Sequence, residues 1–283
     1  MNQHVTTQFS ISRRGALRSV AAAALCASPM AWAQKASETP WRMLVNEAVT
    51  ADLSISMLAT RYRDWADYMA AQIRNKQVTV DPVIDIRRFV QQAQSDQKPL
   101  LVFGKSVNQL SKLVRDQGYQ PLVRRNEPYK AAFIVPAGSS IQTFADLGGR
   151  KLLMPDEFSA TSAVAKAEIR RANIREPYIS HTRFQESVAN QIATGLAEAG
   201  VVNPTVAKKW KEGGGRIVGE TQPVVNWSVL ASPKASPDMV ARLTESLLAM
   251  NGQSAGLLAG IGVKQWARAE KADYLALLDY TGE

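Results

Sequence analysis

Residues 138–174, "GSSIQTFADLGGRKLLMPDEFSATSAVAKAEIRRANI", contain a glycine turn, a short apolar run and the start of a strongly helical segment. Ser159, Thr161 and Ser162 lie where the helical segment begins. A hydroxyl at a helix start satisfies a free backbone N–H, and the N–H groups at the positive end of the helix dipole also attract anions. The stretch therefore predicts either a simple cap or a cap that also holds an anion.

Around this stretch the sequence alternates between apolar runs of strand length and segments with helical spacing, which is typical of an α/β layer with a mostly parallel sheet. In 56–74 the spacing predicts a buried face made of Met57, Leu58, Tyr62, Trp65, Met69 and Ile73. The predicted strands are 41–49, 77–84, 98–104, 119–125, 129–138, 150–155, 199–204 and 223–233; the predicted helices are 56–74, 85–97, 107–118, 140–149, 155–174, 185–200 and 236–251.

The alternation restarts after Pro128, and the end of the chain supplies one or two further helices. This pattern predicts two α/β lobes joined by crossing strands. The predicted first lobe is 34–128 together with 227–283, and the predicted second lobe is 129–226.

The first 33 residues have the pattern of a signal peptide. A Ser-Arg-Arg-x-x-Leu-Arg order at 12–18 precedes an Ala-rich apolar run, and Ala31-Trp32-Ala33 is a small-x-small cleavage triplet. We expect cleavage after Ala33 and a periplasmic location, with twin-arginine and general secretory export both open. The apolar run is too short to span a membrane.

The composition excludes several chemistries for the mature chain. Cys26 is the only cysteine and lies in the leader, which excludes disulfides, thiol catalysis and cysteine-based metal sites. The formal net charge is +9, of which the leader contributes three arginines, so the mature chain carries +6. That balance suits an anionic ligand or surface, and no basic run indicates nucleic-acid binding.

No catalytic motif stands out. The sequence lacks the nucleophile-elbow, P-loop and zinc-protease patterns, and His181 is the only histidine of the mature chain. We therefore expect no catalytic residues, no metal and no cofactor.

The 138–174 stretch resembles the second-lobe opening of the substrate-binding proteins of phosphate, phosphite and phosphonate ABC transporters. The likeness continues in "TRYRDWADYMAAQI", "GYQPLVRRNEPYKAAFIV", "GLAEAGVV" and "GLLAGIGVKQW". It implies the two-lobed type II periplasmic-binding-protein fold, a small anionic ligand in the cleft, an inner-membrane ABC permease as partner, and a monomer.

The resemblance also implies site residues in the second lobe. Thr161 and Ser162 match the second and third hydroxyls of a Ser-Thr-Ser-Gly helix start, while Ala160 and Ala163 depart from it, and Ser159 stands one position earlier as a substitute donor. The family's histidine falls either on His181 or, by spacing, on Gln185. Asn203 ends a strand that faces the cleft in that fold, although Asn-Pro is also a good turn.

Further candidates come from strand ends, where open α/β sheets bind ligands. Lys105 and Ser106 follow a predicted strand and precede a helix. Asn46 ends the first strand in an equivalent position, and Trp227 lies in the returning strand, where it lines either the cleft or the core.

The favoured function is the capture of a small oxyanion for an ABC importer. The preferred ligand is a phosphonate or a related phosphorus compound. Three alternatives stay open: another anion such as a sulfonate, nitrate or an organic cofactor precursor; a periplasmic sensor of the same fold; and a periplasmic enzyme.

Overall fold

The computed structural model describes residues 41–47, 54–73 and 77–283. The chain divides into Met1–Glu38 and a compact unit, Thr39–Glu283, and the description below concerns the second of these. The predicted signal peptide lies outside the described residues. Within those residues, no helix has both the length and the hydropathy needed to cross a bilayer.

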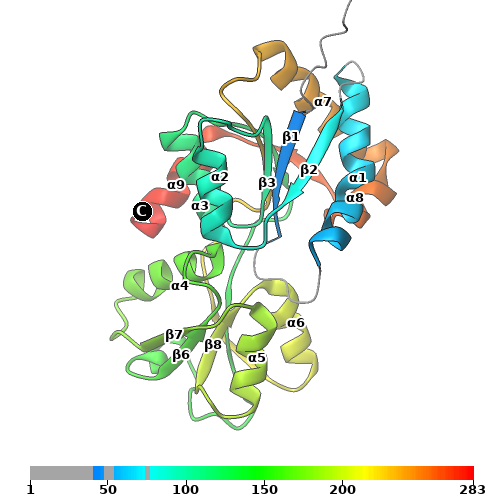
Figure 1. The fold of residues 1–283 in the computed structure, drawn as a ribbon. Helices are drawn as coiled ribbons and strands as arrows, with labels where there is room; N and C mark the ends of the chain where they lie inside the picture. Colours follow the sequence, from blue (N-terminus) through cyan, green and yellow to red (C-terminus); the bar gives the residue numbers. More distant parts are fainter. Residues whose placement is uncertain (1–40, 48–53, 74–76) are drawn as a thin grey trace, which may run out of the picture. The chain divides into compact units, whose positions relative to one another are not determined.

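Two mixed β-sheets organise the compact unit (Figure 1). The first sheet has the strand order β11-β4-β10-β3-β1-β2. Its strands are β1 (Trp41–Asn46), β2 (Val78–Pro82), β3 (Leu101–Gly104), β4 (Gln120–Arg125), β10 (Ser228–Ala231) and β11 (Trp266–Arg268).

The second sheet has the order β7-β6-β8-β5-β9. Its strands are β5 (Ala132–Val135), β6 (Lys151–Met154), β7 (Tyr178–His181), β8 (Ala199–Val202) and β9 (Arg216–Glu220). The chain passes from the first sheet to the second at 126–131 and returns at 221–227. In these two crossing segments, Tyr129 and Val224 form an antiparallel bridge.

Helices flank both sheets. Around the first sheet lie α1 (Ile55–Gln72), α2 (Ile86–Gln94), α3 (Val107–Asp116), α7 (Pro237–Gln253), α8 (Ala255–Gly260) and α9 (Lys271–Thr281); α4 (Ala160–Arg171), α5 (Gln185–Ala193), α6 (Pro204–Glu212) and the 3₁₀ turn Phe144–Leu147 belong to the second. Helix α9 contacts both α3 and α4, so it connects the helices of the two sheets.

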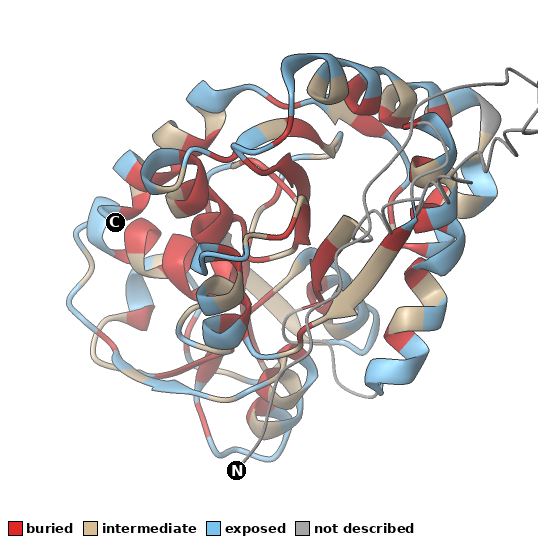
Figure 2. Ribbon diagram, turned by 45° about the horizontal axis from the view of Figure 1, so that its top comes forward, coloured by how far each residue is buried: buried red, intermediate tan, exposed pale blue. Residues whose placement is uncertain are grey.

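Side-chain alternation along the strands explains the core. In β1, Met43 and Val45 pack with α1 and α7 on one face, whereas Leu44 joins the cluster with α2 and α3 on the other. That second cluster continues into the second sheet through Phe133, and Ile134 points to the opposite face with α5 and α6. The buried residues follow the strands and the inward faces of the helices (Figure 2).

Some local expectations differ from the structure. The pairing is mixed rather than mostly parallel, because β5 and β10 run antiparallel to both of their neighbours. Helix α5 ends at Ala193 rather than near 200, since Gly195 takes a left-handed φ of 75° and β8 starts at Ala199. Met57 is 54% exposed, so the buried face of α1 begins at Leu58.

Candidate functional site

A cavity of about 450 Å³ lies where loops from both sheets meet. Its walls include the residue that follows β3, the residues that follow β4 and the residue that follows β8, which are strand ends of the kind that bind ligands in α/β proteins. The cavity is lined by Arg61, Lys105, Ser106, Arg125, Glu127, Pro128, Tyr129, Ser159, Ala160, Thr161, Gln185, Glu186, Asn203, Pro204, Thr205, Asn226, Trp227 and Lys264.

Four helices begin at this cavity. Ser106, Ser159 and Asn203 are the N-cap residues of α3, α4 and α6, and Gln185 is the first residue of α5; all four line the cavity. The first N–H groups of a helix have no intrahelical acceptor, and the aligned peptide dipoles place partial positive charge there. Their convergence makes the cavity a favourable place for an anion.

At the start of α4, the hydroxyl that caps the helix differs from the groups that can bind a ligand. The Ser159 hydroxyl accepts from the Ser162 N–H at 3.2 Å and is therefore the cap. The Ser162 hydroxyl donates to the Pro155 carbonyl at 3.0 Å, away from the cavity. Ala160 and Thr161, the first two residues of α4, line the cavity, and the first N–H groups of a helix have no intrahelical acceptor, so they are available to an anion.

Thr161 is the centre of a buried polar cluster. Its hydroxyl accepts from Gln185 Nε2 at 2.7 Å and lies 2.5 Å from the Tyr129 hydroxyl. Gln185 Oε1 accepts from the Asn203 N–H at 2.9 Å, which ties the starts of α4, α5 and α6 together. Burial raises the pKa of Tyr129, so its phenol stays protonated at neutral pH.

The wall nearest the first sheet carries positive charge. Lys105 forms an ion pair with Glu47, and its Nζ lies 4.0 Å from the centroid of the Trp227 ring. Burial lowers the pKa of Lys105, although the neighbouring Glu47 carboxylate opposes that shift. Arg125 also lies over Trp227, with Cζ 4.8 Å from the centroid, so two cations contact one indole ring.

Arg125 additionally pairs with Glu127 at 3.2 Å. Partial burial alone raises the pKa of Glu127, but its own backbone N–H, Arg125 and Lys264 outweigh burial and lower it. The lining side chains include four cations and two carboxylates, a net charge of +2. The net positive charge and the four helix N-termini therefore both favour an anionic ligand.

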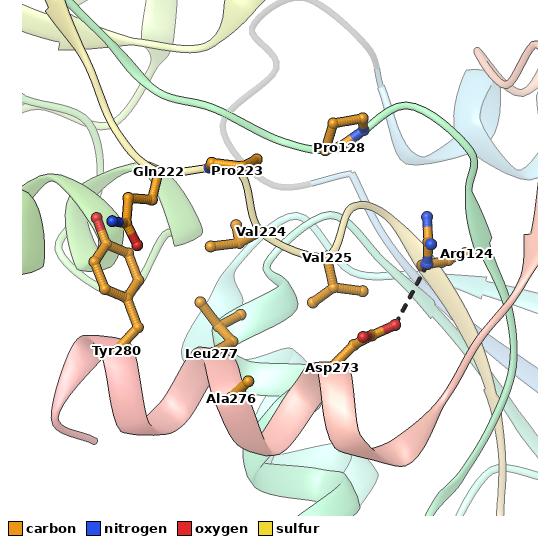
Figure 3. Close-up of a pocket in the computed structure, with 10 residues that line it drawn as sticks. All are labelled: Arg124, Pro128, Gln222, Pro223, Val224, Val225, Asp273, Ala276, Leu277 and Tyr280. Carbon is orange, nitrogen blue, oxygen red and sulfur yellow. Dashed lines mark ion pairs between the residues drawn. The ribbon is translucent and has the colours of Figure 1, made fainter.

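A second cavity, of about 330 Å³, lies between the crossing segment at 222–225 and α9 (Figure 3). Val224, Val225 and Leu277 give it apolar walls. Its charged residues, Arg124 and Asp273, pair with each other at 3.6 Å, so it offers an anion no net charge. The first cavity, at which four helices begin and which has a net positive lining, is the candidate site.

The comparisons with known proteins agree with this geometry. Residues 48–274 match the family model of the ABC transporter phosphonate periplasmic substrate-binding proteins. The chain belongs to this family. No curated protein sequence matches the chain.

Solved structures similar to the chain include PhnD1 from Prochlorococcus marinus in complex with methylphosphonate, at 14% identity and a TM-score of 0.69, covering 86% of this chain and 97% of that one. The binding-protein component of an ABC phosphonate transporter from Pseudomonas aeruginosa is 11% identical, with a TM-score of 0.65 and 86% of each chain covered. XAC2383 from Xanthomonas citri bound to ATP is 14% identical, with a TM-score of 0.69, covering 86% and 96%. These likenesses show the type II periplasmic-binding-protein fold, as the sequence predicts.

The cavity brings seven of the ten predicted site residues together. They are Lys105, Ser106, Ser159, Thr161, Gln185, Asn203 and Trp227. Contact with a ligand stays a prediction for each of them. Within the described part of the chain, no group of three or more His, Asp or Glu side chains is placed to hold a metal ion.

The other three predicted residues do not line the cavity. Asn46 is fully buried and donates to the Val83 carbonyl, because β1 ends inside the first sheet. Ser162 and His181 both contact the Pro155 carbonyl, His181 through Nδ1 at 2.7 Å. Of the two histidine-position alternatives, Gln185 is the one at the cavity.

The lining residues that the sequence did not predict include Arg61, Arg125, Glu127, Tyr129 and Lys264. A signal existed for the middle three, since Arg125 and Glu127 lie at or just after the end of one predicted strand and Tyr129 at the start of the next, and strand ends line such clefts. Arg61 lies on α1 and Lys264 just before β11. Only the packing of α1, α7 and α8 on the first sheet brings these two residues to the site.

Proposed function

We propose that this chain captures a small oxyanion, with a phosphonate as the first choice, in the cavity at the starts of α3, α4, α5 and α6. One observation carries the proposal: four helix N-termini and a net positive lining converge on one cavity in a chain of the phosphonate-binding family. Methylphosphonate in the structurally similar PhnD1 supports the ligand class.

The proposed role is delivery of the ligand to an inner-membrane ABC permease, with no reaction catalysed. We further propose export with cleavage after Ala33 and a monomer. Residues 34–128 with 227–283 form the first lobe in this proposal, and 129–226 form the second. The distribution of strands between the two sheets supports that division.

A ligand that binds only the folded state raises the free energy of unfolding by about 2.7 kcal/mol at a concentration of 100 times Kd. The melting temperature rises accordingly. At about 2–4 °C per kcal/mol for a chain of this size, that is a shift of roughly 5–10 °C. A thermal-shift screen in a phosphate-free buffer compares methylphosphonate, phosphite, phosphate, methanesulfonate and nitrate.

The proposal expects the phosphorus compounds to produce the largest shifts. Methanesulfonate is the matched control, because it has the shape of methylphosphonate with a lower charge. If methanesulfonate or nitrate shifts the melting temperature more than the phosphorus compounds do, the ligand is that other class of anion and not a phosphonate. No shift with any oxyanion refutes the proposed function.

A further inference from the structure

The two walls of the cavity differ in chemistry. The wall nearest the second sheet is lined by residues with neutral hydrogen-bonding groups: Ala160 and Thr161 at the start of α4, and Asn203 at the start of α6. Its charged side chain is Glu186, which is exposed. This wall suits a compact oxyanion held by hydrogen bonds.

The opposite wall carries most of the cavity's positive charge. Arg61 and Lys105 share one carboxylate, Glu47, with Arg61 Nη1 3.5 Å away. Glu127 pairs with Arg125, and Lys264 forms no ion pair with a described residue. Counted over the described residues, the four cations of this wall face the carboxylates of Glu47 and Glu127, which leaves +2 at this wall, and Glu186 on the other wall brings the site to +1.

The cavity also has room for more than a minimal ligand. A volume of about 450 Å³ lies within the range of cavities that bind drug-sized ligands, which are much larger than methylphosphonate. The indole of Trp227, which Lys105 and Arg125 both contact, adds an apolar surface beside the cations.

We propose that the ligand is a phosphonate with a second anionic group, whose phosphonate binds at the start of α4 while a carboxylate on its tail binds the cations around Trp227. This inference rests on the proposed function and narrows its ligand class. A cationic tail, as in an aminoalkylphosphonate, meets net positive charge at this wall and is disfavoured.

The test is isothermal titration of the full mature chain with five probes. Methylphosphonate has no second group; phosphonoacetate, 3-phosphonopropionate and 4-phosphonobutyrate add a carboxylate at increasing distance; 2-aminoethylphosphonate adds a cation. The best carboxylate probe should bind at least about tenfold more tightly than methylphosphonate, as expected for one charge-assisted contact. The aminoalkyl probe should be weaker than that carboxylate probe.

The variant Arg125→Gln should bind the best carboxylate probe about ten- to a hundredfold more weakly than the wild type does. Its effect on methylphosphonate should stay within about threefold, since salt screens the longer-range attraction. Lys264→Gln, at an exposed position, gives a second variant that does not depend on Arg125 tolerating substitution. Arg63→Gln, an exposed arginine on α1 outside the cavity, is the matched charge control.

Equal affinity for methylphosphonate and every carboxylate probe overturns this inference and leaves the proposed function standing. Tighter binding of 2-aminoethylphosphonate also overturns it, as does an equal loss for all probes in Arg125→Gln. If none of the five phosphonates binds, the proposed function fails and the inference fails with it.

Discussion

Replacing Thr161 with valine tests the polar cluster at the centre of the site. Valine keeps the shape of threonine and removes the hydroxyl that Gln185 Nε2 and the Tyr129 hydroxyl both contact. Gln185 and Tyr129 are buried, with 2% and 7% exposure, so only water in the cavity can replace the lost partner. Each buried group left unsatisfied costs about 1–3 kcal/mol, which predicts a destabilisation of up to roughly 6 kcal/mol.

The same substitution should weaken ligand binding. A threonine hydroxyl accepts two hydrogen bonds and donates one. If Gln185 and Tyr129 both donate to Thr161, the hydroxyl hydrogen is left for an anion in the cavity. Loss of one hydrogen bond to a charged group costs about 1.5–3 kcal/mol, or roughly ten- to a hundredfold in Kd.

Thermal unfolding measures the first effect and isothermal titration with methylphosphonate the second. Thr60→Val, at an exposed position of α1, is the control and should change neither quantity. A double-mutant cycle with Tyr129→Phe should give a coupling of about 0.5–3 kcal/mol. Wild-type affinity in a folded Thr161→Val variant would refute the ligand role of this hydroxyl, and additive stability effects in the cycle would refute the cluster.

Three further predictions concern other parts of the chain. The Glu168 carboxylate accepts hydrogen bonds from Arg171, Tyr280 and the Gln222 N–H; burial raises its pKa, but these bonds outweigh burial and lower the pKa below the ordinary 4.5. The stabilisation from these bonds is present above about pH 4.5 and is lost as the pH falls further. The difference in melting temperature between wild type and Glu168→Gln should therefore narrow from pH 7 to pH 3. A Cβ on Gly200 would lie 2.3 Å from Ile192 Cδ1, so Gly200→Ala should cost about 1–3 kcal/mol, whereas Gly256→Ala, with open space around it, should cost nothing; equal melting temperatures would contradict this. Intact mass of the exported protein should correspond to a chain starting at Gln34, and any other first residue would count against the cleavage site.

The order of strands and helices was predictable where the local pattern was strong. Residues 101–104 and 132–135 are short apolar runs beside clear helix signals, and both are buried strands. Helix α6 is not among the predicted helices, although Asn203 and Pro204 form a good start signal. The three-residue β11 is too short for any pattern, because it exists only through pairing with β4.

The site was predictable to the extent that it is made of helix starts. Ser159, Thr161 and Asn203 carry cap chemistry that is visible in the local sequence. His181 and Gln185 could not be separated by spacing, since the choice depends on the pairing of β7 with β6, which leaves His181 beside Pro155. The cation wall depends on tertiary packing, and no local signal selects Arg61 or Lys264.

The central claim is that backbone N–H groups at the start of α4 hold an oxyanion, and Ala160→Pro tests it most directly. Proline is well tolerated at the first position of a helix, and Ser159 already has the extended conformation, φ −69° and ψ 152°, that precedes proline. The variant therefore removes one N–H donor from the cavity without breaking the helix.

Isothermal titration of wild type and Ala160→Pro with methylphosphonate is the decisive measurement. Lys271→Pro, at the first position of α9 and outside the cavity, is the matched control. The account predicts saturable 1:1 binding by wild type and by the control, and affinity weaker by about tenfold or more in a folded Ala160→Pro variant. Equal affinity in the folded Ala160→Pro variant, or no binding of methylphosphonate by wild type, would contradict it.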